Sequence, residues 1–134
     1  MTDLSSQAVN AARAQVRSLY GEEYLPGDAA RHHPTQARGA QEAHEAIRPA
    51  GSKFIHPDTL KSKLDEREYK LYKLIWSRTI ACQMKSAKLE QTIIKIGDGD
   101  FIFETRGKII QFPGFLKAYV ESSDDPNAKL DNME

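Results

Sequence analysis

The sequence predicts an α+β fold in which N-terminal helices are followed by a small antiparallel β-sheet. Before residue 88, apolar residues recur at spacings of three and four, which is typical of amphipathic helices. After residue 88, β-branched and aromatic residues cluster around a glycine-rich turn, which is typical of a hairpin. The change of pattern near residue 88 is the expected boundary between structural units. A length of 134 residues fits one ordinary domain or parts of two.

The first expected element is an amphipathic helix over residues 5–20. Ser5 or Ser6 can cap the free N–H groups of its first turn, and Gly21 can end it because glycine readily adopts a left-handed conformation. The apolar face of this helix consists of Leu4, Ala8, Val9, Ala12, Val16 and Leu19.

Two further helices are expected before the boundary. Residues 41–47 are good helix formers that stop at Arg48-Pro49, because proline disfavours helix in the residue before it. Residues 65–84 predict a longer helix. Its face is marked by Tyr69, Tyr72, Ile75, Trp76, Thr79, Ile80 and Gln83. The aromatic members of this face could stack on bases, but such stripes more often form core.

The C-terminal part predicts strands at 92–96 and 101–105, joined by a turn at Gly97-Asp98-Gly99-Asp100. Residues 109–112 are expected to add a third strand. A sheet of this size has exposed edges and is only marginally stable alone in water. We therefore expect another segment or a second copy of the chain to cover it.

Charge is balanced overall but uneven along the chain. Lys plus Arg and Asp plus Glu each number 19, so no global attraction to nucleic acid is expected. Residues 61–88 hold eight basic residues against three acidic ones, which predicts a local basic surface. Residues 121–134 hold five acidic residues against one lysine and are expected to form a flexible, solvated tail.

Several classes of protein are disfavoured. The sequence has no signal peptide and no apolar run of about 18 residues, so we expect a cytoplasmic protein without a membrane partner. The single cysteine, Cys82, cannot form a cysteine-based zinc site and is expected to be a buried thiol. A metal-binding regulator that uses His32, His33 and His44 is the weakest hypothesis, because their spacing is poor. No cofactor or metal site is expected in this chain.

His44 is the candidate functional residue. On a helix over 41–47, its imidazole and the Arg48 guanidinium one turn later would project from one side and could together bind a phosphate. The alternative is that His44 only packs or caps at a helix end, and spacing does not decide between the two.

Several motifs resemble those of bacterial type IA DNA topoisomerases. The most specific is Gln41-Glu42-Ala43-His44-Glu45-Ala46-Ile47-Arg48-Pro49, preceded by Ala40. Residues 4–26 resemble the helix and loop that follow the tyrosine motif of the family, and Tyr72–Trp76 with Ala81–Met84 is similar to a later helix. Residues 99–101, 106–108 and 112–115 resemble the β-rich arch of the family.

This resemblance implies an interior fragment that begins just after the active-site tyrosine motif, since Thr2-Asp3-Leu4-Ser5 matches only the residues beyond it. The nucleophilic tyrosine and the magnesium-binding toprim domain would both be missing, so the chain alone is expected to be inactive. His44 is implied to line the cleavage site and contact the DNA backbone, with Arg48 as a second DNA-binding residue.

By the same resemblance the chain divides into four parts. Residues 1–50 would belong to the tyrosine-bearing helical domain, and 51–88 would be a linker and long basic helix. Residues 89–120 would be arch strands, and 121–134 the acidic tail.

Two hypotheses about function follow. The first is a fragment of an ATP-independent, magnesium-dependent type IA topoisomerase that cleaves, passes and rejoins single DNA strands to relax negative supercoils in the bacterial nucleoid. The second is a non-enzymatic protein-interaction module that uses an exposed β edge. In either case, unpaired strand edges could also support a homodimer.

Overall fold

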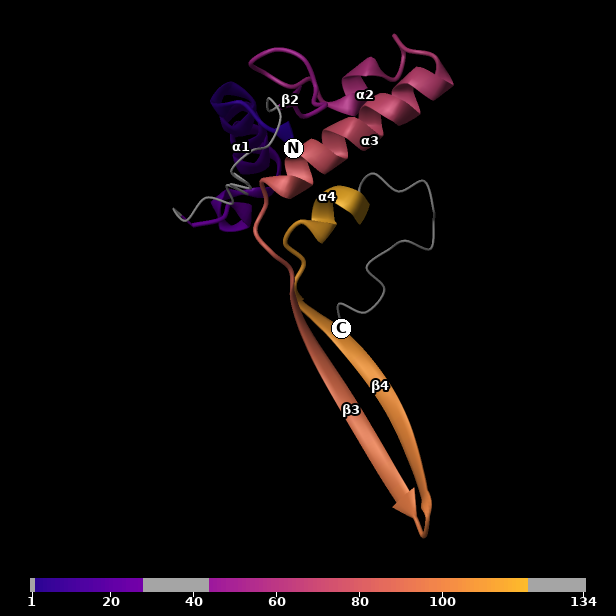
Figure 1. Cartoon of the computed structure of the whole chain (residues 1–134). Helices are drawn as coiled ribbons and strands as arrows, with labels where there is room; N and C mark the ends of the chain where they lie inside the picture. The colour runs from indigo at the N-terminus through magenta and orange to yellow at the C-terminus, as the bar shows by residue number, and fades with distance from the viewer. Residues whose placement is uncertain (1, 28–43, 121–134) are drawn as a thin grey trace.

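A computed structural model describes residues 2–27 and 44–120, and the predicted acidic tail lies outside them. Figure 1 shows a helical body from which one long β-hairpin projects. The elements of the body are β1 (Thr2–Asp3), α1 (Ser6–Tyr20), a 3-10 turn (Glu22–Tyr24), β2 (His44–Glu45), α2 (Pro57–Leu60), α3 (Glu66–Cys82) and α4 (Leu116–Val120). The hairpin consists of β3 (Lys88–Asp98) and β4 (Phe101–Phe112). The predicted α+β fold class is confirmed.

Helix α1 begins and ends where its sequence predicts. The Ser5 hydroxyl accepts a hydrogen bond from the Ala8 N–H at 3.3 Å, which caps the first turn. At the other end Gly21 has a φ of 100°, and its N–H donates to the Val16 carbonyl. The buried face is built mainly from small side chains, which allows α3 to approach closely. It consists of Ala8, Ala11, Ala12, Val16 and Tyr20.

Helix α3 is fixed at its start by a capping box. The Asp65 carboxylate accepts from the N–H groups of Arg67 and Glu68, and the Glu68 side chain accepts from the Asp65 N–H in return. The helix buries Trp76, Ser77, Thr79, Ile80 and Ala81. Trp76 is 3% exposed, so the predicted aromatic stripe contributes to the core at this position.

A polar bridge connects α1, α3 and the segment before α2. The Trp76 indole N–H donates to Gln15 Oε1 at 2.6 Å, and Gln15 Nε2 donates to the Phe54 carbonyl at 2.7 Å. Because an indole can only donate, the oxygen of the Gln15 amide must face it, and the nitrogen then faces Phe54. Tyr72 adds a second link through its hydroxyl, which donates to the Ile55 carbonyl at 2.7 Å.

The hairpin is clamped to the body where its strands meet. The Lys85 N–H donates to the Tyr24 carbonyl at 2.7 Å, and the Phe115 N–H donates to the Lys85 carbonyl at 2.9 Å. Gly114 has a φ of 51°, and a Cβ there would lie 2.6 Å from backbone atoms of Ser86, so only glycine fits. After this close approach of the two chain segments at Gly114, α4 packs on α3 and buries Ala118 completely.

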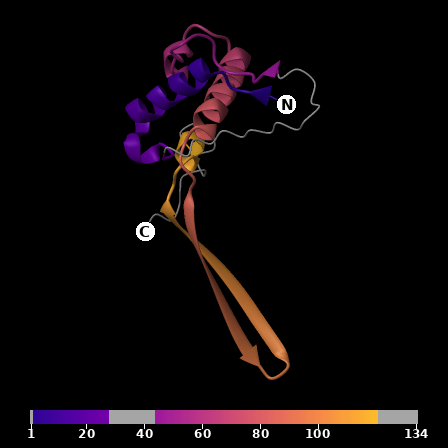
Figure 2. The ribbon, with the colours of Figure 1, turned by 60° about the vertical axis from the view of Figure 1, so that its left-hand side comes forward.

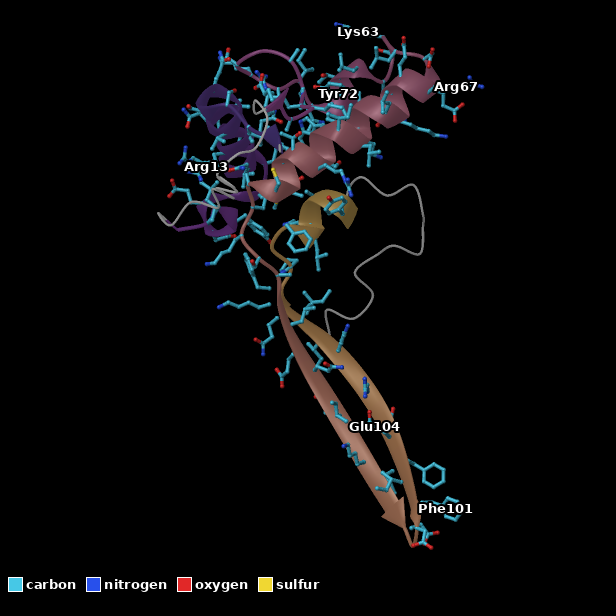
Figure 3. All side chains as sticks on the ribbon, in the orientation of Figure 1. Arg13, Lys63, Arg67, Tyr72, Phe101 and Glu104 are labelled. Carbon is cyan, nitrogen blue, oxygen red and sulfur yellow. The ribbon has the colours of Figure 1, made fainter. Side chains whose placement is uncertain are left out.

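The hairpin itself has two different faces. Residues that are opposite each other in the ladder, such as Ile96 and Phe103, have their side chains on the same face. Every second residue along each strand lies on that face too. One face carries five large apolar side chains and two charged ones, Glu90 and Asp98, and we call it the apolar face. Its apolar members are Ile94, Ile96, Phe101, Phe103 and Ile109, all about half exposed or more. The opposite face carries Glu104 between Lys95 and Arg106. Figure 3 shows how far this hairpin extends from the body.

Three sequence predictions are corrected. Residues 109–112 do not form a third strand, because they continue β4 along an extended β3. The helix expected over 41–47 is wrong at His44 and Glu45, which form strand β2, while residues 41–43 lie outside the described part. Cys82, expected to be buried, is exposed because it lies on the side of the last turn of α3 that faces away from the core, whereas Ala81 on the same turn is buried.

Replacing Gln15 should destabilise the body. We expect Gln15→Leu to lower the free energy of unfolding by roughly 2–4 kcal/mol, because the Trp76 N–H and the Phe54 carbonyl both lose their partner. Urea unfolding followed by the fluorescence of Trp76 measures this. Gln7→Leu is the matched control on the exposed face of α1 and should change stability by less than about 0.5 kcal/mol. If Gln15→Leu and Gln7→Leu changed the free energy of unfolding equally, the stabilising role of the Gln15 bridge would be contradicted.

Candidate nucleic-acid-binding site

The candidate site is organised by pairing between two short strands. β1 and β2 are parallel, with Thr2 opposite His44 and Asp3 opposite Glu45. Figure 2 shows the two strands side by side at the edge of the helical body. Residues 42 positions apart in the chain therefore share one backbone ladder. This pairing fixes the backbone of His44 relative to the start of α1, which a mobile loop would not do.

Arg48 holds the chain that leaves β2. Its Nε donates to Glu45 Oε1 at 2.7 Å, and its Nη1 donates to the carbonyls of Pro49 and Gly51 at 3.0 and 3.3 Å. The Arg48 side chain is only 17% exposed. A guanidinium with these partners has a fixed orientation, because its planar donors point in set directions.

Glu45 connects this arginine to the first helix. Hydrogen bonds from Arg48 and then from Ser5, the N-cap of α1, hold the pKa of the Glu45 carboxyl below its ordinary value of 4.5. The carboxylate thus links β2 with the residue that begins α1. Sequence reasoning overlooked Glu45, although its position within the Gln41–Pro49 motif was the available signal.

The structure changes the expected geometry of the His44 and Arg48 pair. The two residues were expected one turn apart on a helix, but His44 lies on a strand and Arg48 lies four residues on in a segment without regular secondary structure. Helical spacing therefore does not explain any common role. Three contacts link them. Glu45 pairs with Asp3 next to His44 in the β1–β2 ladder, the Glu45 carboxylate accepts from Arg48, and Arg48 donates to the Gly51 carbonyl.

The comparison with known proteins identifies the family. A family model described as DNA topoisomerase matches residues 1–134. The chain belongs to the bacterial type IA DNA topoisomerases. It is 50% identical over 131 residues to DNA topoisomerase 1 of Synechocystis sp. and 52% identical over 138 residues to that of Streptomyces coelicolor. These matches cover 98% and 99% of the chain but only 14% of each relative.

A solved topoisomerase has the same fold over this region. Full-length topoisomerase I from Thermotoga maritima matches with a TM-score of 0.67 and 31% identity, over 87% of the chain and 17% of the solved structure. Membership of the topoisomerase family does not favour the alternative of a non-enzymatic interaction module.

The metal hypothesis gains no support from the described part of the topoisomerase chain. Residues 2–27 and 44–120 contain no group of three His, Cys, Asp or Glu side chains that could hold a metal ion. His32 and His33 lie outside these ranges. His56 has another role, since its Nδ1 accepts from the Asp58 N–H at 3.3 Å and caps α2. None of the described helices is long and apolar enough to cross a membrane.

The Glu45 contacts should make stability sensitive to acid. A carboxyl whose pKa is lowered by folding stabilises the native state above its unfolded pKa, and this stabilisation is lost as pH falls through the lowered value. We therefore expect the native chain to lose more stability below about pH 4.5 than Glu45→Gln does. Urea unfolding at neutral and acid pH measures the difference.

Glu23→Gln, a change at an exposed glutamate of the 3-10 turn, is the matched control for this experiment. It should keep the acid sensitivity of the native chain. Identical pH profiles for the native chain and Glu45→Gln would contradict the linking role of Glu45.

Proposed function

We propose that this chain is one wall of the active site of an ATP-independent topoisomerase that relaxes negative supercoils by cleaving and rejoining single DNA strands. In this proposal His44 contacts the DNA backbone next to the scissile phosphate. Arg48 contributes positive charge and keeps the segment after β2 in place. The nucleophilic tyrosine and the Mg²⁺ site would come from other parts of the longer protein, so the isolated chain would not relax DNA.

The pairing of Thr2 with His44 is the observation that best supports this proposal. Thr2 and Asp3 match the residues that directly follow the tyrosine motif in the family, and they lie opposite His44 and Glu45 in one ladder. In the longer protein, a tyrosine a few residues before Thr2 would therefore lie close in space to the backbone of His44. Fixed backbone positions suit catalysis, because the donor must be held close to its productive geometry.

The chemistry of the two residues suits the same role. Phosphodiester transfer spreads negative charge over phosphate oxygens, and a positioned donor stabilises that charge. Imidazole can donate a hydrogen bond in its neutral or charged form. Further cations lie along α3 and the turn before it, where Lys61, Lys63, Arg67 and Arg78 are all exposed. Figure 3 shows Lys63 and Arg67 at the outer end of α3, where they could bind a DNA backbone.

We infer that this chain contributes to more than one domain of the longer protein. Residues 1–50 would belong to the tyrosine-bearing domain, residues 51–88 would form the linker and long basic helix, and residues 89–120 would belong to the arch. The enzyme would act in the cytoplasm, at the nucleoid. These assignments are supported by the family membership and by the way the hairpin projects from the body.

Substitution of His44 tests the proposed active-site role. In the full-length enzyme that contains this chain, we expect His44→Ala to slow cleavage of a single-stranded oligonucleotide on the order of 100-fold, because a donor to the phosphate is lost. His56→Ala removes a histidine that caps α2 and serves as the control. Normal cleavage by His44→Ala would contradict the proposal, whereas slow cleavage by both variants would point to a general loss of structure.

We also propose that two copies of the isolated chain associate through an outer edge of the hairpin. In a two-stranded sheet each strand has a row of backbone groups that points away from its partner, and such edges recruit other strands. Pairing between two copies would extend the sheet to four strands and place their apolar faces side by side in one surface. It would lower the exposure of Ile96, Phe101 and Phe103, which are 61%, 71% and 64% exposed.

A charge on the apolar face should weaken this association. We expect Ile94→Lys to raise the dissociation constant of the dimer severalfold, because it places a charge on the apolar face beside the second copy. Ile93→Lys is the matched control, since Ile93 is similarly exposed but lies on the charged face. Sedimentation equilibrium measures both. A native chain that stays monomeric at high concentration would contradict the proposed dimer.

A further inference from the structure

The hairpin root, residues 85–88 and 112–117, carries three lysines that the proposed cleavage site does not use. Lys85 follows α3, Lys88 begins β3 and Lys117 lies in α4. The Phe115 N–H donates to the Lys85 carbonyl at 2.9 Å, so these segments meet at one place. Figure 1 shows that the hairpin leaves the helical body at this point. The three lysines therefore mark the junction between the body and the hairpin.

Two neighbouring aromatic rings position the lysines. The ring centroids of Tyr24 and Phe112 are 4.9 Å apart. The Lys85 Nζ lies 5.7 Å from the centre of the Phe112 ring, and the Lys117 Nζ lies 5.1 Å from the centre of the Tyr24 ring. An ammonium group at this distance is attracted by the negative face of the ring. Lys88 is opposite Phe112 in the ladder. One aromatic pair thus gathers cations from three segments.

The positive charge of the hairpin root is not neutralised within residues 2–27 and 44–120. No carboxylate of these ranges forms an ion pair with Lys85, Lys88 or Lys117. The neighbouring carboxylates have other contacts: Glu22 pairs with Arg17, and Glu90 accepts from the Gln111 side chain. Cations gathered in this way repel one another, and a bound anion would remove the repulsion.

The lysines are accessible to such an anion. Lys85 and Lys88 are exposed, and Lys117 is partly exposed. Each ammonium group has three N–H donors and acts as a point charge, which suits the oxygens of a phosphate. Lys85 and Lys117 lie over different rings, so the charges are spread along a surface and do not converge on one point. This arrangement suits the repeated phosphates of a nucleic-acid strand better than one small ion.

We propose that Lys85, Lys88 and Lys117 bind the phosphate backbone of single-stranded DNA at the hairpin root. This second contact rests on the proposed DNA-binding function, but it does not involve His44. A strand bound here contacts both the body and the hairpin, because the lysines belong to both. Lysine contacts to phosphates carry no information about the bases, so the contact does not depend on sequence.

Binding of a fluorescein-labelled oligothymidylate to the 134-residue chain tests this site. Fluorescence anisotropy gives the dissociation constant over a range of salt concentrations. We expect the double variant Lys85→Gln/Lys117→Gln to raise the dissociation constant on the order of tenfold at low salt. The slope of log Kd against log salt should fall by about 1.4, because each lost contact to a single strand removes about 0.7.

A second double variant controls for the change in total charge. Lys95→Gln/Lys108→Gln removes the same charge from the opposite face of the hairpin, away from its root. It should change the dissociation constant by less than about threefold, because salt screens charges that do not contact the strand. Lys85→Arg/Lys117→Arg keeps both cations and should bind like the native chain. Circular dichroism checks that each variant is folded.

A thymine peptide nucleic acid of the same length has no phosphates and shows which part of the strand is bound. It should bind the native chain and Lys85→Gln/Lys117→Gln equally weakly. Native affinity of Lys85→Gln/Lys117→Gln for the oligothymidylate would overturn the proposal. Equal losses in the two glutamine double variants, or no binding by the native chain at low salt, would overturn it too. None of these results affects the cleavage test of His44→Ala, which uses the full-length enzyme.

Discussion

The Gln15 side chain connects the three segments that meet in the helical body. It accepts from the Trp76 indole N–H and donates to the Phe54 carbonyl, so α1, α3 and the chain before α2 share one pair of hydrogen bonds. Apolar packing alone is less selective, because the small residues of α1 would tolerate several positions of α3. The position of α3 in turn fixes the root of the hairpin, where Lys85 follows the end of this helix.

The body and the hairpin are stabilised in different ways. The body has a closed core in which Ile80, Met84, Val16 and Ala118 are fully buried. The hairpin is held by its ladder, by cross-strand pairs and by the clamp at Gly114 and Lys85, while its apolar face remains exposed. Such a face is the part of the molecule that most needs a partner. A chain that spans 14% of its relatives can lack the segments that would cover it.

The proposed cleavage site depends on backbone pairing more than on side-chain packing. Parallel pairing of β1 with β2 brings the motif around His44 to the segment before α1. Glu45 and Arg48 then attach this ladder to the cap of α1 and to the loop at Gly51. Family membership makes His44 the residue to test, and this geometry gives a physical reason why its position would be held constant.

The sequence by itself determined the features that depend on neighbouring residues. Ser5 and Gly21 marked the ends of α1, and the apolar spacing marked α3 to within two residues of its observed ends. The turn near Gly99, with a φ of 58°, was evident because few other residues adopt that conformation. The Gln41–Pro49 motif was sufficient to indicate the family, which the comparisons confirm.

Only the tertiary structure decided the features that depend on distant residues. The helix-forming composition of 41–47 favoured a helix, but at His44 and Glu45 the ladder with β1 replaced it, since hydrogen bonds to another strand can override local propensity. The length of β4 depended on how far β3 extends opposite it, which no local pattern indicates. A cavity between α2, α3 and α4 likewise forms only when these helices pack, because each of them contributes part of its lining.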